Sequence, residues 1–241
     1  MVAASHPTLS SAEVGVLATA SGIALQSYRA AHVAGCASRA CVRLGVDDVG
    51  ALADRLRRDA VARAAFRRAV LVGVTRMFRD EGEFELLERT WLPELLEGRE
   101  RIDVWSAGCS NGDELRSVAV LLERLGALDG AHLLGSDVLE ESLAAATAAL
   151  ASEPAATRAA VRFEHRDLIA EGPPARSFDL VLCRNVAIYL AKTEQRALHA
   201  KLVAALRTGG VLMLGRSETL FDPAALGLER IARHAFRKVA A

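Results

Sequence analysis

The chain has 241 residues, 51% of them apolar, and its 30 lysines and arginines balance its 30 aspartates and glutamates. This length suits one α/β domain with an appendage, or two small domains, with enough apolar residues for a sizeable core. Balanced charge argues against nonspecific nucleic-acid binding, which usually needs net positive charge. No apolar run is long enough to span a bilayer, so we expect no membrane insertion. Four cysteines without a CxxC pair and six histidines without an HExxH pair predict reduced thiols in a cytoplasm and no metal site.

The first part of the chain, residues 1–72, predicts a small helical domain. From residue 8 onward the sequence is rich in alanine and arginine, with apolar residues three or four apart. Ser10 or Ser11 is expected to cap the first helix, and Asp47-Asp48 precedes another amphipathic helix. The arginines of this region are most simply a solvated face, and the alternative is a surface that meets an acidic partner.

A further helix is predicted from Glu83 to Leu96, just after the segment VTRMFRD. The central feature then follows at residues 101–119, RIDVWSAGCSNGDELRSVA. It predicts a buried strand, a turn of small residues and a helix, the arrangement that holds nucleotide-like ligands in open α/β sheets. Cys109 stands where the dinucleotide GxGxxG pattern would have a glycine, and no GK[ST] follows. An ordinary βα turn, with Asp113 and Glu114 favouring the helix dipole, is the alternative.

The second predicted strand, Leu133 to Asp137, ends in an acid and precedes an alanine-rich helix from Glu140 to Leu150. In a doubly wound sheet, an acid at this position meets the ribose hydroxyls of a ligand. A purely structural capping role for Asp137 is the alternative, and the sequence leaves both open.

Next come a short strand at 161–163 and a near-continuous apolar run, Phe178 to Cys183, typical of a central parallel strand. Asn185 and Tyr189 follow this run at the ligand-binding edge, which makes both candidate functional residues. A helix from Thr193 to Leu206 is expected to stop at Gly209-Gly210, followed by a strand at 211–214 and a closing hairpin at 228–239. These alternating elements predict an α/β sheet with helices on both faces.

Five segments, taken together, resemble the CheR family of chemotaxis receptor methyltransferases. They are VTRMFRD, VWSAGCSNGDE, LLGSDV, FDLVLCRNVAIYL and GGVLMLGRSETL. The family reads approximately T-x-F-F-R-D, W-S-A-G-C-S-x-G-E-E-P-Y-S, S-D-I-D, F-D-x-I-x-C-R-N-V-x-I-Y-F and G-G-x-L-x-x-G-x-S-E. The resemblance covers about residues 70–220. It implies a Rossmann-like class I methyltransferase domain at 73–241 behind an all-α domain at 1–72, and methyl transfer from S-adenosylmethionine to glutamate carboxylates.

The resemblance also assigns individual residues. Arg79 and Tyr189 match the family's two residues at the reacting centre. The positions implied to bind S-adenosylmethionine, or its product S-adenosylhomocysteine, are Thr75, Ala107, Gly108, Asp113, Asp137, Asp167, Leu168, Arg184 and Asn185. Because a carboxylate acceptor is already a nucleophile, such a site mainly has to align donor and acceptor.

The chain also departs from the family pattern. Asp113 replaces a glutamate, Met77 replaces a phenylalanine, and the family's inserted antiparallel subdomain is shortened between Asp137 and Asp167. Receptor docking is therefore weakly supported, and the acceptor is left open between a protein glutamate and a small-molecule acid. A non-catalytic module that binds the cofactor is the alternative function, and an NAD-type oxidoreductase is disfavoured because GxGxxG is missing.

Overall fold

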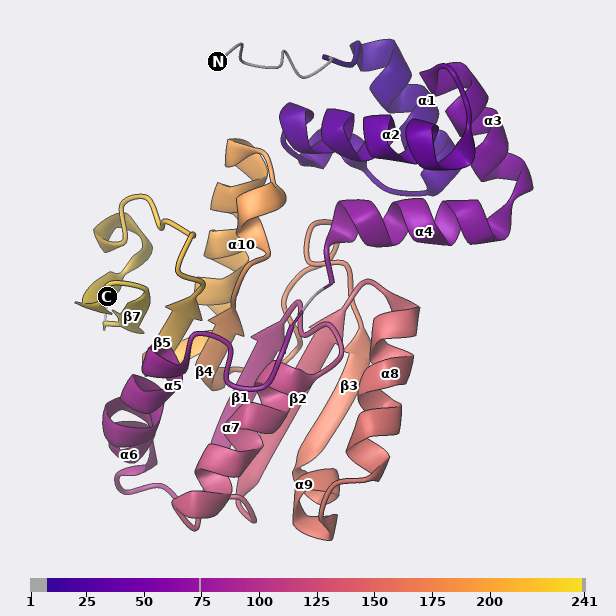
Figure 1. Cartoon of the computed structure of the whole chain (residues 1–241). Helices are drawn as coiled ribbons and strands as arrows, with labels where there is room; N and C mark the ends of the chain where they lie inside the picture. Colours follow the sequence, from indigo (N-terminus) through magenta and orange to yellow (C-terminus); the bar gives the residue numbers. More distant parts are fainter. Residues whose placement is uncertain (1–7, 74, 240–241) are drawn as a thin grey trace. The chain divides into compact units, whose positions relative to one another are not determined.

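The computed structural model describes residues 8–73 and 75–239, which form two compact units (Figure 1). One unit holds the chain up to Val72 together with Tyr189–Gln195, and the other holds Gly73–Ile188 and Arg196–Ala241. Residues 1–7 of the predicted helical domain, and Val74 of the segment VTRMFRD, lie outside the described residues. The segment Tyr189–Gln195 therefore belongs to the helical unit by its contacts, although the sequence assigned this segment to the α/β domain.

The helical unit is a bundle around an apolar core that includes Leu17, Leu52 and Phe66, none of them exposed. Its elements are α1 (Ser11–Ser21), η1 (Leu25–Ser27), α2 (Ala30–Leu44), α3 (Val49–Arg58) and α4 (Ala60–Leu71). The predicted caps are confirmed, because Ser10 forms a capping box with Glu13 and the Asp48 carboxylate accepts the Ala51 N–H at 2.8 Å.

The second unit contains a seven-stranded sheet with the strand order β3-β2-β1-β4-β5-β7-β6. The strands are β1 (Ile102–Ala107), β2 (Ala131–Asp137), β3 (Val161–His165), β4 (Phe178–Cys183), β5 (Leu206–Leu214), β6 (Leu228–Ala232) and β7 (Ala235–Lys238). The first five strands of this order run parallel, whereas β7 is antiparallel to both β5 and β6. The order reverses between β1 and β4, so the loops that follow these two strands border the crevice where open α/β sheets bind ligands.

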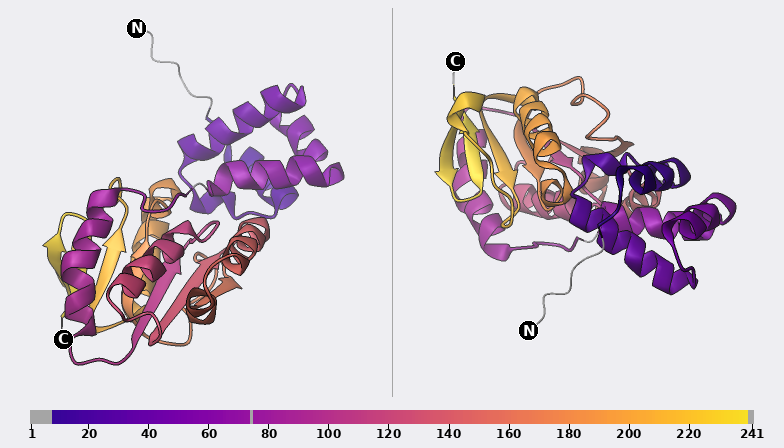
Figure 2. Two further views of the ribbon diagram at one scale, coloured as in Figure 1. Left: turned by 60° about the horizontal axis from the view of Figure 1, so that its bottom comes forward. Right: turned by 90° about the horizontal axis from the view of Figure 1, so that it is seen from above.

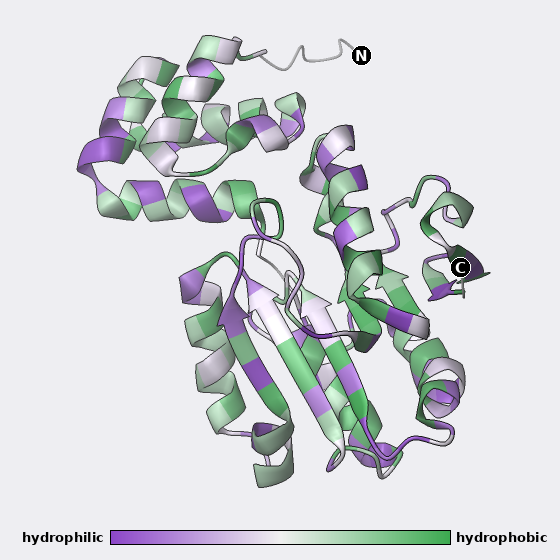
Figure 3. Cartoon of the chain, turned by 180° about the vertical axis from the view of Figure 1, so that it is seen from behind, coloured by the Kyte–Doolittle hydropathy of each residue, from purple (hydrophilic) through white to green (hydrophobic). Residues whose placement is uncertain are grey.

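Helices cover both faces of this sheet, as predicted. One face carries α5 (Glu81–Leu86), η2 (Leu87–Trp91), α6 (Leu92–Leu96), α7 (Asp113–Arg124), α8 (Glu140–Ala151) and α9 (Ala155–Ala160), and α10 (Lys192–Ala205) lies on the other (Figures 1 and 3). Figure 2 gives two further views of these layers. Val104 and Leu133 of the strands form one apolar core with Leu115 and Leu122 of α7. This packing fixes the start of α7 at the end of β1, because the turn between them has only five residues.

The predicted helix from residue 193 to 206 is confirmed as α10, but the prediction that Gly209-Gly210 stops it was wrong. The helix α10 already ends at Ala205, and both glycines lie inside β5. The pairing of β5 with β4 shifts register between Phe178 and Leu180, and Gly209 has φ +81°. A Cβ on Gly210 would lie 3.0 Å from the Asp179 carbonyl oxygen, so the glycines permit an irregular, close strand pairing. The predicted closing hairpin is confirmed as β6 and β7.

The segment between Asp137 and Asp167, all of it described, forms α8, α9 and β3. Its one strand, β3, pairs parallel with β2. The segment therefore holds no antiparallel subdomain, in line with the shortening expected from the sequence.

Among the described residues, no helix is both long enough and apolar enough to span a membrane.

His199 of α10 makes the stability of the fold depend on pH. Burial lowers the pKa of this imidazole from 6.5 to about 4, and its Nε2 atom has no hydrogen-bond partner in the described part of the chain. Since the unfolded chain takes up this proton first, stability is lost as pH falls from 6.5 towards 4, by up to about 2 kcal/mol at pH 5. In urea unfolding at pH 7 and pH 5, His199→Leu should remove that difference.

The control for this prediction is His132→Asn, at a half-exposed histidine of β2. It should keep the acid-induced loss that His199→Leu removes. An unaltered pH dependence in His199→Leu would contradict the prediction.

Candidate active site

The carboxyl ends of the five parallel strands bring five loops of the second unit to one edge of the sheet. Most predicted site residues lie on these loops or at the strand ends that lead into them. They are Ala107 at the end of β1, Gly108 after β1, Asp137 at the end of β2, Asp167 and Leu168 after β3, and Arg184 and Asn185 after β4. The sheet topology therefore gathers residues that lie up to 78 positions apart in the sequence, from Ala107 to Asn185.

The turn after β1 approaches the loop after β4 at Gly108. Gly108 has φ +81°, and a Cβ built on it would lie 2.5 Å from Cγ2 of Val186. Its N–H and that of Cys109 both donate to the Ser136 carbonyl, at 2.8 and 2.9 Å. Only glycine fits this conformation and this gap, so the turn presents bare backbone at the crevice, as a closely held ligand requires.

Asp137 ties the end of β2 to the turn after β1. Its carboxylate accepts the N–H groups of Ser110 and Leu139, at 2.8 and 2.9 Å. Burial raises the pKa of this carboxyl. The structural role that the sequence left open is therefore present, and the lone pairs left on the two oxygens are available to ligand hydroxyls.

The two acids that begin α7 face different surroundings. The Asp113 carboxylate accepts from Arg116 at 3.0 Å, and Arg116 also pairs with Glu153 at the end of α8. Glu114 is buried instead, and it accepts the Ser106 hydroxyl at 2.8 Å. The sequence indicated no role for Glu114 beyond the helix dipole. Its spacing of three and seven residues from Ser117 and Leu121 places it on the core-facing side of the same helix, and this was the signal that could have found it.

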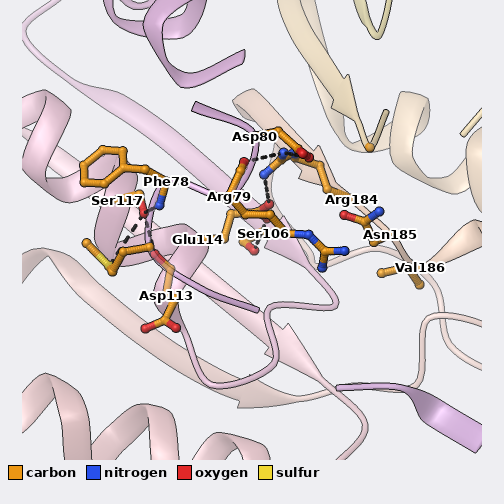
Figure 4. Close-up of polar contacts among 12 residues, drawn as sticks. Phe78, Arg79, Asp80, Ser106, Asp113, Glu114, Ser117, Arg184, Asn185 and Val186 are labelled. Atoms are coloured by element: carbon orange, nitrogen blue, oxygen red, sulfur yellow. Dashed lines mark hydrogen bonds and ion pairs between the residues drawn. The ribbon is translucent and has the colours of Figure 1, made fainter. Parts of the chain in front are cut away.

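Arg184 holds the segment that carries Arg79 against α7. Its guanidinium, 2% exposed, donates to Glu114 at 3.2 Å, to the Asp80 carboxylate at 2.8 Å and to the Arg79 carbonyl at 2.7 Å. It also lies over the Phe84 ring, 5.1 Å from the centroid. Figure 4 shows the contacts of Arg184 with Glu114, Asp80 and Arg79. Arg184 therefore fixes the main chain of Arg79.

A second contact fixes the same segment from α7. The Phe78 N–H donates to the Ser117 hydroxyl at 2.9 Å. Phe78 and Asp80 have φ +50° and +63°, so both neighbours of Arg79 are held in the left-handed region. Such strained residues persist only where surrounding contacts hold them, and they cluster at functional sites. In Figure 4 the Arg79 side chain extends away from the Arg184 guanidinium.

Glu218, which follows β5, organises the loop after β4. Its buried carboxylate accepts the N–H groups of Asn185, Val186 and Ala187 at 2.7–2.9 Å, and that of Gly215 at 2.6 Å. Burial raises the pKa of this carboxyl. Asn185 has φ +62°, which these bonds maintain. The sequence contained Glu218 within the family-like segment GGVLMLGRSETL, yet nothing in its spacing indicated four backbone partners.

Three further residues, Asp167, Leu168 and Thr75, were predicted to bind the cofactor. The Asp167 carboxylate accepts the Ile169 and Ala170 N–H groups, at 2.8 and 3.1 Å, and so shapes the loop after β3. The Leu168 carbonyl accepts from Lys201 of α10 at 3.1 Å. Thr75 is half-buried in the segment before Arg79. Contacts of these residues with a cofactor stay predictions.

Tyr189 is held by the helical unit. Its carbonyl accepts the Arg29 N–H at 2.9 Å, and its ring centroid lies 4.9 Å from that of His32. A ring nitrogen of His32 is 2.8 Å from the Val70 carbonyl at the end of α4 and donates to it. The main chain beside Tyr189 also joins this unit, through a bridge between Leu190 and Tyr28. The pairing of Tyr189 with Arg79 at one reacting centre stays a prediction.

Comparison with known families identifies this arrangement. The family model described as the S-adenosylmethionine-binding domain of CheR methyltransferase matches residues 73–158 and 153–232. The chain belongs to the CheR methyltransferase family. The matched ranges include the five strand ends and every predicted site residue, Tyr189 among them. The resemblance stated from the sequence is confirmed.

Curated relatives agree with this assignment. A chemotaxis protein methyltransferase of Listeria monocytogenes is 31% identical over 72% of this chain and 75% of its own length. Chemotaxis protein methyltransferase 1 of Pseudomonas aeruginosa is 29% identical over 83% of this chain and 85% of its own. Among solved structures, CalS10, an amino pentose methyltransferase of Micromonospora echinaspora with bound S-adenosylmethionine, aligns with 67% of this chain and 57% of its own at 24% identity, TM-score 0.43.

This CheR-family chain is an S-adenosylmethionine-dependent methyltransferase, and S-adenosylmethionine is its cofactor. The crevice fits such a group, because Gly108 brings bare backbone to its edge and because the Asp137 oxygens retain lone pairs for hydroxyls. When bound, the cofactor supplies a methyl group on a positively charged sulfur.

Proposed function

We propose that this chain transfers the methyl group to a carboxylate oxygen, either of a protein glutamate or of a small-molecule acid. Arg79 orients the acceptor carboxylate, and the Tyr189 hydroxyl donates a hydrogen bond to it. Ala107 and Gly108 line the methionine and ribose end of the cofactor, Asp137 accepts the ribose hydroxyls, and Asp167 with Leu168 lies at the adenine. Thr75, Asp113, Arg184 and Asn185 complete the cofactor side.

The observation that carries this proposal is the fixed main chain around Arg79. Ser117 and Arg184 hold it from two elements, and strained residues flank it on both sides. A guanidinium positioned in this way suits a carboxylate, which it can bind through two parallel hydrogen bonds. A carboxylate is ionised at neutral pH, so the reaction needs alignment more than a general base.

The curated relatives support a protein acceptor. Two of them, about 30% identical to this chain, are named chemotaxis protein methyltransferases. The segment between Asp137 and Asp167 favours no particular acceptor, since it consists of two helices and a parallel strand. The cytoplasmic location expected from the free thiols stays a prediction.

The test is methyl transfer to carboxylates from labelled S-adenosylmethionine, with glutamate-rich peptides and small organic acids as acceptors. We expect a base-labile methyl ester on at least one acid. Micromolar binding of S-adenosylhomocysteine without transfer to any acid would instead support the non-catalytic module. Transfer only to amines or hydroxyls would contradict the carboxylate assignment while leaving the methyltransferase assignment intact.

The proposed ribose contact of Asp137 gives a prediction on cofactor affinity. Asp137→Asn should weaken S-adenosylhomocysteine binding about tenfold, the effect of about 1.4 kcal/mol from one lost charge-assisted hydrogen bond. With saturating cofactor, kcat should change much less. Calorimetric titration measures the affinity.

The 2′-deoxy analogue of S-adenosylhomocysteine separates this contact from the structural role of Asp137. The analogue should bind the wild type more weakly than the parent compound, and Asp137→Asn should weaken it no further. Equal losses for both ligands in the variant would mean that Asp137 acts only through the Ser110 turn.

A further inference from the structure

A hollow of about 220 Å³ lies between the segment after β5 and the β6–β7 hairpin of the second unit. We call it the arginine hollow, because Arg216, Arg230 and Arg233 line it together with Ser217 and Thr219. All of these residues carry side-chain hydrogen-bond donors. None of them has been given a role in the site described above.

The positive charge of the arginine hollow is not balanced from within. Its one lining acid is Glu218, and that carboxylate already accepts four backbone N–H groups. Arg233 is exposed, and its guanidinium has no hydrogen-bond or ion-pair partner within residues 8–73 and 75–239. Arg230 lies over the Phe236 ring, 4.7 Å from the centroid, and donates to a carbonyl rather than to an acid. The hollow therefore has guanidinium donors available for an anion.

The arginine hollow adjoins the segment that carries Arg79. The Arg216 guanidinium is 4.0 Å from the carboxylate of Asp80, the residue that follows Arg79. Glu218 lines the hollow and also holds Asn185 at the end of β4. The hollow thus borders the segment that carries Arg79, within the same unit of the protein.

We propose that the arginine hollow binds a second carboxylate of the methyl acceptor, beside the one that receives the methyl group. The acceptor is then a compound with at least two carboxylates, from an acidic peptide segment or from a small polycarboxylic acid. Guanidinium groups bind carboxylates through paired, charge-assisted hydrogen bonds, and Ser217 and Thr219 add hydroxyl donors. This inference rests on the proposed carboxylate methylation.

Direct binding tests the hollow without any methyl transfer. Citrate serves as the probe, titrated calorimetrically at low ionic strength into full-length protein saturated with S-adenosylhomocysteine. The double variant Arg216→Gln/Arg233→Gln should weaken citrate binding at least tenfold. Arg101→Gln is the matched control, because Arg101 is exposed like Arg233. It lies just before β1, 3.9 Å from Asp103, at the end of β1 opposite to the loops that carry the site. Equal citrate affinity in the double variant and the wild type would overturn the proposal.

Transfer kinetics then distinguish the two sources of the carboxylates. For a peptide with adjacent glutamates, or for citrate as acceptor, the double variant should raise KM at least tenfold and change kcat less than twofold. An acceptor with a single carboxylate should be unaffected. An equal KM in the double variant and the wild type, for a methylated acceptor with two or more carboxylates, would overturn the inference. If no acid is methylated at all, the proposed function fails, while the citrate titration still decides whether the hollow binds anions.

Discussion

Arg79→Ala should lower methyl transfer by about 10²- to 10³-fold and leave S-adenosylhomocysteine affinity within about threefold. The physical reason is that an oriented charged donor at the reacting centre contributes about 3–4 kcal/mol to the transition state. Binding of the cofactor does not require that donor in the proposed arrangement. Single-turnover transfer from labelled S-adenosylmethionine measures the rate, and calorimetry measures the affinity.

Arg76→Ala is the control for this prediction. Arg76 lies three residues earlier in the same segment and is exposed, so its removal should change transfer less than twofold. Arg79→Lys should recover part of the rate, since it keeps the charge but loses the paired donors. If Arg79→Ala turns over like the wild type with a confirmed acceptor, the proposed reacting centre is wrong.

Glu114→Ala should lower the free energy of unfolding by about 2–3 kcal/mol, because it removes one of the two carboxylates that pair with the buried Arg184 guanidinium and leaves the buried Ser106 hydroxyl without its acceptor. Transfer should fall as well, since Arg184 also holds the Arg79 carbonyl. Urea unfolding measures the stability, and kcat at a temperature where the variant is folded measures the second effect.

The neighbouring residue supplies a matched control. Asp113→Ala removes a carboxylate whose partner, Arg116, still pairs with Glu153, so stability should fall by only about 1 kcal/mol. The double variant Glu114→Leu/Arg184→Met replaces the ion pair with apolar side chains and should recover much of the lost stability. A larger loss in Asp113→Ala than in Glu114→Ala would reverse the assignment made from the structure.

The sequence by itself determined the fold class, the family and the edge of the sheet that carries the site. The near-continuous apolar run from Phe178 to Cys183 predicted a central buried strand, and the polar residues directly after it were therefore expected at a strand end. Gly108 and Asp137 were found in the same way, because strand ends of a parallel sheet gather at one edge. These features are local, so short segments of sequence suffice to indicate them.

The tertiary structure decided what depends on partners far apart in the chain. It gave the neighbouring acids Asp113 and Glu114 different roles, because Glu114 pairs in the interior with Arg184, 70 residues away in the sequence. It showed Glu218 holding the loop of Asn185, and it joined Tyr189 to the helical unit through Arg29 and His32. Local patterns report strand ends and helix faces, but ion pairs, backbone caps and uncompensated arginines arise only when distant segments are packed together.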